Sequence, residues 1–145
     1  MRSLIKRFFR LSFHQQSLLM EAFFWLSLFS LLIRLLPFRR FAHLAGEQGK
    51  QADPVLSESQ RSRAILIGWA VAAASRHTLY PSTCLMQAMS GMRMLRRRHI
   101  PATLYFGVNS AAGSGLQAHA WLVCGTVVLT GAEGRSDYRV VSTYA

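Results

Sequence analysis

Acidic residues are scarce in this 145-residue sequence. Six Asp and Glu stand against seventeen Lys and Arg, which gives a formal net charge of +11. An excess of this sign is suited to an anionic partner, such as nucleic acid, an anionic membrane surface or an acidic peptide. The one local concentration of basic residues is "RMLRRR" at 93–98, which is typical of a solvated helix face and could also attract an acidic peptide.

Cysteine is equally rare, with only Cys84 and Cys124. The basic N-terminus is followed by no small-residue signal cleavage site, so we expect a cytoplasmic protein without a disulfide framework. The five histidines show no ligand spacing with acids or cysteines, and we expect neither a metal nor another cofactor. They are His14, His43, His77, His99 and His119.

No apolar run is long enough to span a bilayer. The uninterrupted apolar and serine stretch, 22–33, falls short of the roughly 20 residues that a spanning helix needs. The wider segment 17–41 is still strongly apolar, and it predicts a helical hairpin packed on the rest of the domain or on a partner. The alternative is a helix on the inner membrane surface, because arginines flank the segment at positions 7, 10, 39 and 40.

The chain length fits one domain, or a small domain with an appendage. We divide the chain into an apolar helical N-terminal region with a linker, 1–58, and a second region, 59–145. The linker is the polar, glycine-containing stretch 45–60, which is predicted to be a loop.

Two helices are predicted in the middle of the chain. The first covers 59–77, and its buried stripe is expected to be Ile65, Trp69, Ala72 and Ala73. The second begins after an N-cap at Ser82 or Thr83. Its buried side is expected to be Leu85, Ala88, Met92 and Leu95.

After Pro101 the apolar period changes to two, which indicates strands. Strands are predicted at 102–108, 118–124, 127–130 and 138–144, with a glycine-rich loop at 109–117. The tight turn at 125–126 makes the middle two an antiparallel hairpin. Helices first and a small antiparallel sheet after them indicate an α+β fold.

Cys84 and His119 are the candidate catalytic pair. Cys84 falls in the first turn of the second helix, where unpaired N–H groups and the helix dipole stabilise a thiolate. An imidazole from a later strand would complete the pair that cysteine hydrolases use. Each signal alone also fits an ordinary packed residue, but their order along the chain is more specific. By strand alternation, Cys124 points away from His119 and is expected to be a small core residue.

A third group would orient the imidazole. Downstream of the cysteine, the only carboxylates are Glu133 and Asp137. The turn at 125–126 pairs positions whose numbers sum to about 251, which sets His119 opposite Ala132. We therefore expect Glu133 as the third member, with Asp137 as the second choice.

Two segments carry a resemblance to a known family. "STCLMQAMSGMRMLRRRHIPATLYFGV" and "AHAWLVCGTVVLTGAEG" resemble the leader peptidases of lasso-peptide biosynthesis, which are transglutaminase-like members of the papain-like cysteine enzymes. The resemblance covers residues 65–145 well. It extends more loosely to "EAFFWLSLFSLLIRLLPFRRFAHLAG" in the N-terminal region, and it implies a papain-like, transglutaminase-like fold.

The resemblance implies a cysteine peptidase that frees a lasso-peptide core from its leader by hydrolysing one bond of a ribosomally made precursor. It implies three partners: the precursor peptide, a separate small winged-helix leader-recognition protein and an ATP-dependent macrolactam cyclase. The catalytic residues carry over to Cys84 and His119. The family's acid would fall at 130–131, where this sequence has Thr and Gly. The sequence thus departs from the family there, which leaves the third member open and permits a working Cys–His dyad.

Two amide side chains complete the candidate site. The oxyanion would be held by backbone N–H groups at the start of the Cys84 helix, with Gln117 as an additional donor. Asn109 and Gln117 are also amide substitutes for the missing acid.

Three other functions are weighed. A non-catalytic, membrane-associated assembly protein would be built around residues 17–41. Another amidase or acyltransferase of the same fold would use the same dyad. Nucleic-acid binding is not expected, because the aromatic residues lie in apolar rather than basic segments and no basic helix suited to a groove is evident.

Overall fold

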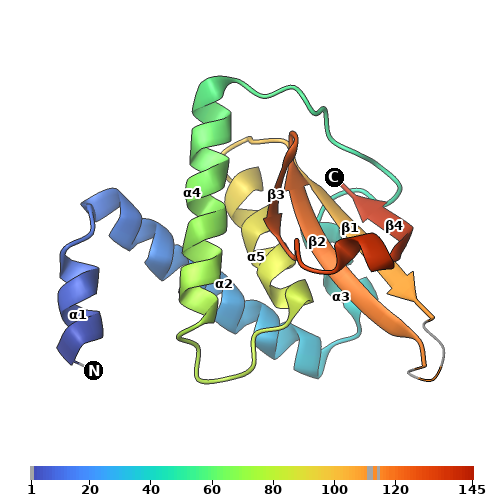
Figure 1. The fold of residues 1–145 in the computed structure, drawn as a ribbon, viewed down its shortest axis with the longest axis horizontal. Helices are drawn as coiled ribbons and strands as arrows, with labels where there is room; N and C mark the ends of the chain where they lie inside the picture. Colours follow the sequence, from blue (N-terminus) through green and yellow to red (C-terminus); the bar gives the residue numbers. More distant parts are fainter. Residues whose placement is uncertain (1, 111–112, 114) are drawn as a thin grey trace.

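The helices of this protein precede its strands (Figure 1). The computed structural model describes residues 2–110, 113 and 115–145. The helices are α1 (Arg2–Phe9), α2 (Phe13–Leu35), α3 (Phe38–Phe41), α4 (Glu58–Ser75) and α5 (Cys84–Arg96). The strands are β1 (Thr103–Asn109), β2 (Gln117–Cys124), β3 (Val127–Thr130) and β4 (Arg139–Tyr144). The 3₁₀ turns are η1 (Ala42–Leu44) and η2 (Arg135–Asp137). The predicted α+β class is confirmed.

Side-chain caps fix where the main helices begin. Ser12 and Gln15 form a capping box at the start of α2, and Ser57 and Gln60 form another at the start of α4. Thr83 caps α5, because its hydroxyl accepts the N–H of the third helical residue. The hydroxyl and amide side chains satisfy backbone donors that have no partner inside the helix. For α4 and α5 these short polar signals set the start within one or two residues of the predicted one, whereas α2 begins four residues before the predicted segment 17–41.

The apolar segment 17–41 forms one long helix rather than a hairpin. Pro37 follows α2, and only the four-residue α3 comes after it. A proline cannot continue the hydrogen-bond ladder of a helix, so the chain turns there. One face of α2 packs against α4 and α5, so the prediction that this segment packs on the rest of the domain is confirmed. The buried residues of α2 include Leu18, Leu26 and Phe29.

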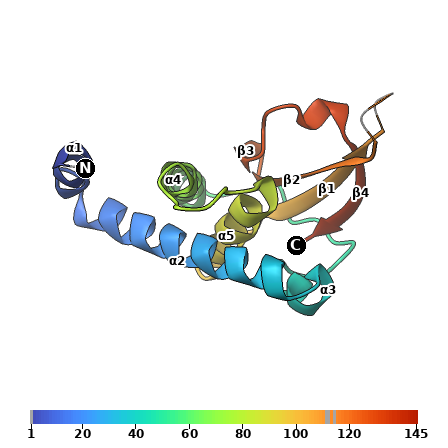
Figure 2. The same cartoon turned by 90° about the horizontal axis from the view of Figure 1, so that it is seen from below.

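The four strands form one antiparallel sheet in the order β3-β2-β1-β4. The helices α2, α4 and α5 lie on one side of this sheet, and η2 lies on the other (Figure 2). Helix α5 packs directly on β2: a Cβ on Gly91 would lie 2.7 Å from Leu122 Cδ2. The Leu122 face of the sheet is therefore the face that closes the core.

The hydrophobic core is continuous from α2 to β4. It crosses the division predicted at residue 58, because α2 side chains pack with those of α4, α5 and the sheet. Both predicted regions thus share one core. Its largest fully buried side chains include Leu18, Phe29, Ile67, Met89, Met92, Leu95, Leu104 and Leu122.

The buried stripe predicted for α4 is wrong by about one residue. Ile65 is 47% exposed and Trp69 is half-buried, whereas Ala64, Ile67 and Val71 are buried. Helix α4 packs against three partners, α2, α5 and β3, so its core-facing surface is broad and its small residues sit at the closest approaches. The prediction placed the large side chains of Ile65 and Trp69 at the centre of the buried face, but they lie at its edge.

The β2–β3 hairpin contains a register shift that the sequence does not reveal. Cys124 pairs with Val127 and Val123 with Val128, as the turn predicts, but Leu122 pairs with Thr130. The bulge adds one residue to β3, so the expected pairing of His119 with Ala132 does not form. The glycine-rich loop predicted at 109–117 connects β1 and β2, and its residues 111, 112 and 114 lie outside the described residues.

Candidate functional site

Cys84 is the first residue of α5 and is half-buried with a free thiol. The N-cap Thr83 takes the N–H of Met86 with its side chain and the N–H of Gln87 with its carbonyl. Within the described chain this leaves the N–H groups of Cys84 and Leu85 as the open donors of the first turn. A developing anion beside the sulfur would meet both donors and the positive end of the helix.

His119 has a defined partner for one ring nitrogen. Its Nε2 lies 2.8 Å from the backbone oxygen of Gly131. The ring packs against Trp121 and Tyr138, with centroid separations of 5.9 and 5.0 Å. Because a carbonyl oxygen only accepts, this contact requires the proton on Nε2 and leaves Nδ1 as the basic nitrogen. Nδ1 is the nitrogen left to take a proton from a thiol.

Gly131 is one of the two residues, with Thr130, at the place where the family resemblance puts an acid. Its φ is +71°, and a Cβ there would collide with the backbone oxygen of Ala120 and approach Trp121 Cβ to 2.9 Å. Only glycine adopts this conformation without strain and fits this space. β3 ends at Thr130, and the chain changes direction at the next residue, Gly131. The result is a backbone carbonyl aimed at the imidazole.

The carboxylates predicted as third members lie elsewhere. Glu133 and Asp137 are both exposed, in the loop and the 3₁₀ turn that follow β3. Among the described residues, neither hydrogen-bonds to the imidazole. Sequence reasoning missed Gly131 because its contribution comes from the main chain. The available signal was the glycine itself, standing at the position expected for the acid.

The two amide candidates lie at the far end of the β1–β2 pair. Asn109 and Gln117 face each other in the register, two positions beyond the pair of Gly107 with His119. Gln117 is exposed and Asn109 is half-buried. No hydrogen bond in the described structure joins either amide to the imidazole.

Cys84 and His119 belong to α5 and β2, which pack directly on each other. Their side chains, however, lie on different sides of the sheet. Helix α5 covers the Leu122 face of β2, whereas His119 shares its face with Trp121, because side chains alternate along a strand. At His119, β2 extends past Leu122, the last residue paired with β3. In the described part of the chain, no hydrogen bond joins the sulfur to the imidazole.

Cys124 is a core residue, as strand alternation indicated. It is fully buried, and its thiol donates a hydrogen bond to the carbonyl of Pro101 at 3.2 Å. Burial raises the pKa of the Cys124 thiol to about 11, because the apolar surroundings disfavour the thiolate. This cysteine is neither accessible nor ionised near neutral pH, whereas the side chain of Cys84 is only half-buried.

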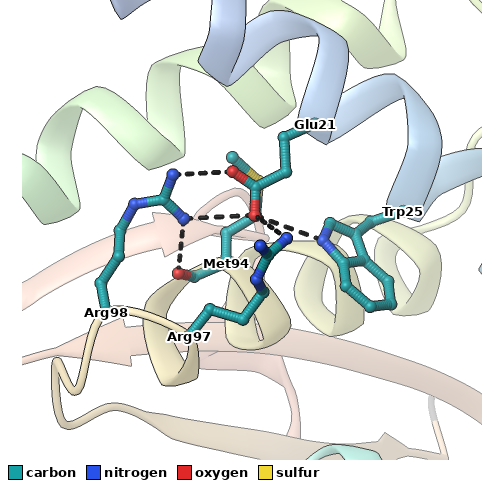
Figure 3. A network of polar contacts seen from close by, with 5 residues as sticks. All are labelled: Glu21, Trp25, Met94, Arg97 and Arg98. Carbon is teal, nitrogen blue, oxygen red and sulfur yellow. Dashed lines mark hydrogen bonds and ion pairs between the residues drawn. The ribbon is translucent and has the colours of Figure 1, made fainter.

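The basic run at the end of α5 is bound by the carboxylate of Glu21 on α2. Arg98 makes a bidentate ion pair with Glu21, with N–O distances of 2.7 and 3.2 Å, and Arg97 adds a contact at 3.1 Å (Figure 3). Trp25 donates its indole N–H to the same carboxylate, and Arg93 lies over the Trp25 ring. Arg93, Arg97 and Arg98 thus make contacts within the molecule, while Arg96 and Arg97 are exposed, so attraction of an acidic peptide stays a prediction.

The electrostatics of Glu21 reflect this network. Burial alone would raise the pKa of Glu21, but the hydrogen bond and charge of Arg98, with Arg97 and Trp25, hold the pKa below its ordinary value. Glu21 is therefore ionised at neutral pH and fixes α2 to the end of α5. The ion pair joins residues 77 positions apart, which no local pattern could reveal.

Two cavities of the described structure lie away from Cys84 and His119. One, of about 310 Å³, is lined by His14, Leu18, Arg63, Ile67 and Arg98. The other, of about 280 Å³, lies near Lys50, Arg96 and Ala145. Size alone thus does not identify the candidate site, which is defined by chemistry: a thiol at a helix start, an imidazole on a strand and a carbonyl that fixes its tautomer.

Comparison with known proteins agrees with that chemistry. The model of one family, the transglutaminase-like superfamily, matches residues 27–143. Enzymes of this superfamily are of the cysteine-peptidase and acyltransferase type. No curated protein and no solved structure matches the chain. The match covers α4, α5, the whole sheet and the second part of α2, and so includes both Cys84 and His119. The chain belongs to the transglutaminase-like superfamily.

Proposed function

We propose that this protein is a cysteine peptidase that removes the leader from a ribosomally synthesised lasso-peptide precursor, with Cys84 as nucleophile and His119 as acid and base. The observation that carries the proposal is the family match over residues 27–143, which includes a cysteine at a helix start and a histidine on a later strand. The resemblance of the Cys84 and His119 segments to leader peptidases supplies the substrate class.

The proposed reaction starts from the His119 tautomer that has its proton on Nε2. Nδ1 of His119 takes the thiol proton, and the thiolate of Cys84 attacks the carbonyl carbon of the scissile bond. The N–H groups of Cys84 and Leu85 stabilise the oxyanion. The imidazolium then gives its proton to the leaving amine, and a thioester forms. Water attacks the thioester while Nδ1 takes its proton, and the acid product leaves as the thiol is restored.

The carbonyl of Gly131 stands in for the acid in this mechanism. It holds the ring by the Nε2 proton and so keeps Nδ1 available, which is the orienting part of an acid's role. It carries no formal charge, so it stabilises the imidazolium less than a carboxylate would. The proposal also requires the sulfur and Nδ1 to meet around the end of β2 that pairs with β1 but not with β3. Catalytic hydrogen bonds commonly tighten only when substrate is bound.

The substrate and partners follow from the same resemblance. The chain would act on a leader-core precursor presented by a small winged-helix protein, and would pass the free core to an ATP-dependent cyclase. Its setting would be the cytoplasm, where a precursor made on ribosomes is first available.

The direct test is cleavage of the precursor in the presence of the leader-binding protein, followed by mass spectrometry. We expect Cys84→Ala and His119→Ala each to reduce turnover at least about a thousandfold, since both take part in every bond change. Cys124→Ala is the matched control and should retain activity. Full cleavage by the Cys84→Ala protein would refute the assignment. Transfer of the acyl group to an added amine instead of water would indicate an acyltransferase.

A second measurement tests the meeting of the two groups without using activity. In a Cys124→Ala background, His119→Cys puts a second thiol at the position of the imidazole. Two cysteines form a disulfide only when their Cβ atoms approach to about 4 Å. We expect the crosslink to form under mild oxidation, more readily with precursor bound. Its absence in both states would rule out the dyad.

A further inference from the structure

Helix α2 has a second apolar face that nothing in the described structure covers. Five large side chains lie on it at intervals of seven and four residues, so they share one side of the helix. They are Phe13 (87% exposed), Met20 (65%), Phe24 (59%), Leu31 (54%) and Leu35 (69%). We name these five residues the α2 stripe. It runs the full length of a 23-residue helix.

The helix is held parallel to the surface of the molecule. By length and composition α2 could cross a membrane, which corrects the expectation drawn from the shorter stretch 22–33. Its opposite face, however, is packed into the core, and Glu21 is bound to Arg97 and Arg98. Crossing a bilayer would expose that carboxylate to hydrocarbon and open the core. Figure 2 shows α2 along one border of the molecule, with α4, α5 and the sheet all on its other side.

Helix α1 extends this surface and adds charge. Ile5 and Phe9 are 52% and 71% exposed, and Lys6, Arg7 and Arg10 beside them are exposed. Figure 1 shows α1 projecting away from the rest of the molecule. Beyond α2, the exposed side chains of Arg39 and Arg40 follow on α3.

The charges around the stripe are of one sign. In residues 1–46 the only acid is Glu21, and its carboxylate is neutralised by Arg97 and Arg98. The exposed charged groups at both ends of the stripe are therefore all cationic. Two copies of this surface would repel each other, whereas an anionic surface would be attracted. An apolar helix face between clusters of Lys and Arg is the pattern of a helix that lies in the headgroup layer.

We propose that α1 and the α2 stripe form the docking surface for an anionic lipid bilayer. The stripe enters the boundary between headgroups and acyl chains, and Lys6, Arg7, Arg10, Arg34, Arg39 and Arg40 lie at the headgroups. The core face of α2 keeps its contacts with α4 and α5, so the domain is carried on the membrane surface without a spanning helix. This role is independent of the proposed peptidase chemistry.

The test is co-sedimentation of the full-length protein with vesicles that contain phosphatidylglycerol and with vesicles of phosphatidylcholine alone. We expect binding to the anionic vesicles that weakens as salt is raised, and about tenfold or more weaker binding to the neutral ones. Equal binding to both vesicle types, or to neither, would overturn the proposal.

Two variants and one control locate the surface. The double variant Phe24→Ser, Leu31→Ser should bind anionic vesicles about tenfold more weakly, as should Lys6→Gln, Arg7→Gln, Arg10→Gln. All the substituted side chains are exposed, and circular dichroism checks that the variants stay folded. Val55→Ser removes a comparably exposed apolar side chain (77%) in the linker before α4, next to the β2–β3 turn, and should change nothing.

The outcomes separate the bilayer from a protein partner. If both variants bind vesicles as the native protein does, the surface is not the one proposed. If sedimentation velocity shows a dimer that the stripe variant abolishes, and vesicles do not compete with it, a second copy covers the stripe and the proposal fails. Precursor cleavage in detergent-free solution is measured in parallel, so that loss of membrane binding with retained cleavage separates the two functions.

Discussion

At the scale of single residues, the site depends on a contact made by the main chain. His119 is held through Nε2 by the oxygen of Gly131, and the conformation that presents this oxygen is open only to glycine. The tautomer is therefore set by backbone geometry instead of by a carboxylate. Glu133 and Asp137, which the sequence offered for this role, remain exposed.

This assignment predicts a specific effect of Gly131→Ala. The added Cβ would collide with the Ala120 oxygen and displace the carbonyl from the imidazole, so we expect turnover to fall by about tenfold to a hundredfold. Gly49→Ala is the matched control, because Gly49 has a similar φ of +80° with nothing within 4 Å. Nitrogen NMR of the native protein should show the proton of neutral His119 on Nε2. A proton on Nδ1, or full activity of Gly131→Ala, would contradict the assignment.

Cys124 gives a second prediction at this scale, for alkaline pH. Its pKa is about 11 in the folded protein, against an ordinary value of 9.0. Because the pKa of this thiol is raised in the folded protein, its contribution to the free energy of unfolding is fully present below pH 9. That contribution is lost as pH rises through about 11. The loss is on the order of 2 kcal/mol. Urea unfolding at pH 8 and pH 11 measures it, and Cys124→Ala should show a smaller decline. An equal decline in both proteins would assign the effect to other groups.

At the scale of elements, the contact between α2 and α5 combines apolar packing with ion pairs. Leu18, Leu26 and Phe29 supply the apolar part, and Glu21 with Arg97 and Arg98 supplies the charged part. Removing one member of a well-desolvated pair leaves the other without its partner, which costs more than the pair itself contributes. The end of α5 therefore depends on a residue of the N-terminal region.

We expect Glu21→Gln to lower the free energy of unfolding by about 2 kcal/mol at neutral pH. The folded pKa of Glu21 is depressed, so its stabilising effect is present above the ordinary value of 4.5 and is lost as pH falls through the lower folded value. The difference between native and variant proteins should accordingly shrink in acid. Glu47→Gln is the matched control: its ion pair with Lys50, at 3.4 Å, is largely exposed, and its loss should change little. A pH-independent difference would exclude the ion pair as its cause.

At the scale of the whole molecule, a single core holds the N-terminal helix and the sheet-bearing part together. The helices occupy one face of the sheet, and α2 forms the outer border of that layer (Figure 2). One side of α2 thus closes the core while the other remains available to an anionic bilayer. The family match begins within α2, at residue 27, and therefore includes only the second part of this helix.

The sequence by itself determined the elements and the chemistry of the candidate pair. Helix caps and the change of period after Pro101 are local signals, so the α+β order and the strand positions followed from them. The helix-start position of Cys84 and the strand position of His119 were local in the same way.

Only the tertiary structure decided what lies between those elements. The bulge in the β2–β3 hairpin brought the oxygen of Gly131, instead of a carboxylate, to the imidazole. The pairing of Glu21 with Arg98 and the burial of Ala64 rather than Ile65 depend on how whole helices pack. None of these three features appears as a periodic pattern in the sequence. Each depends on contacts between residues that are far apart in the chain and meet only in the folded protein.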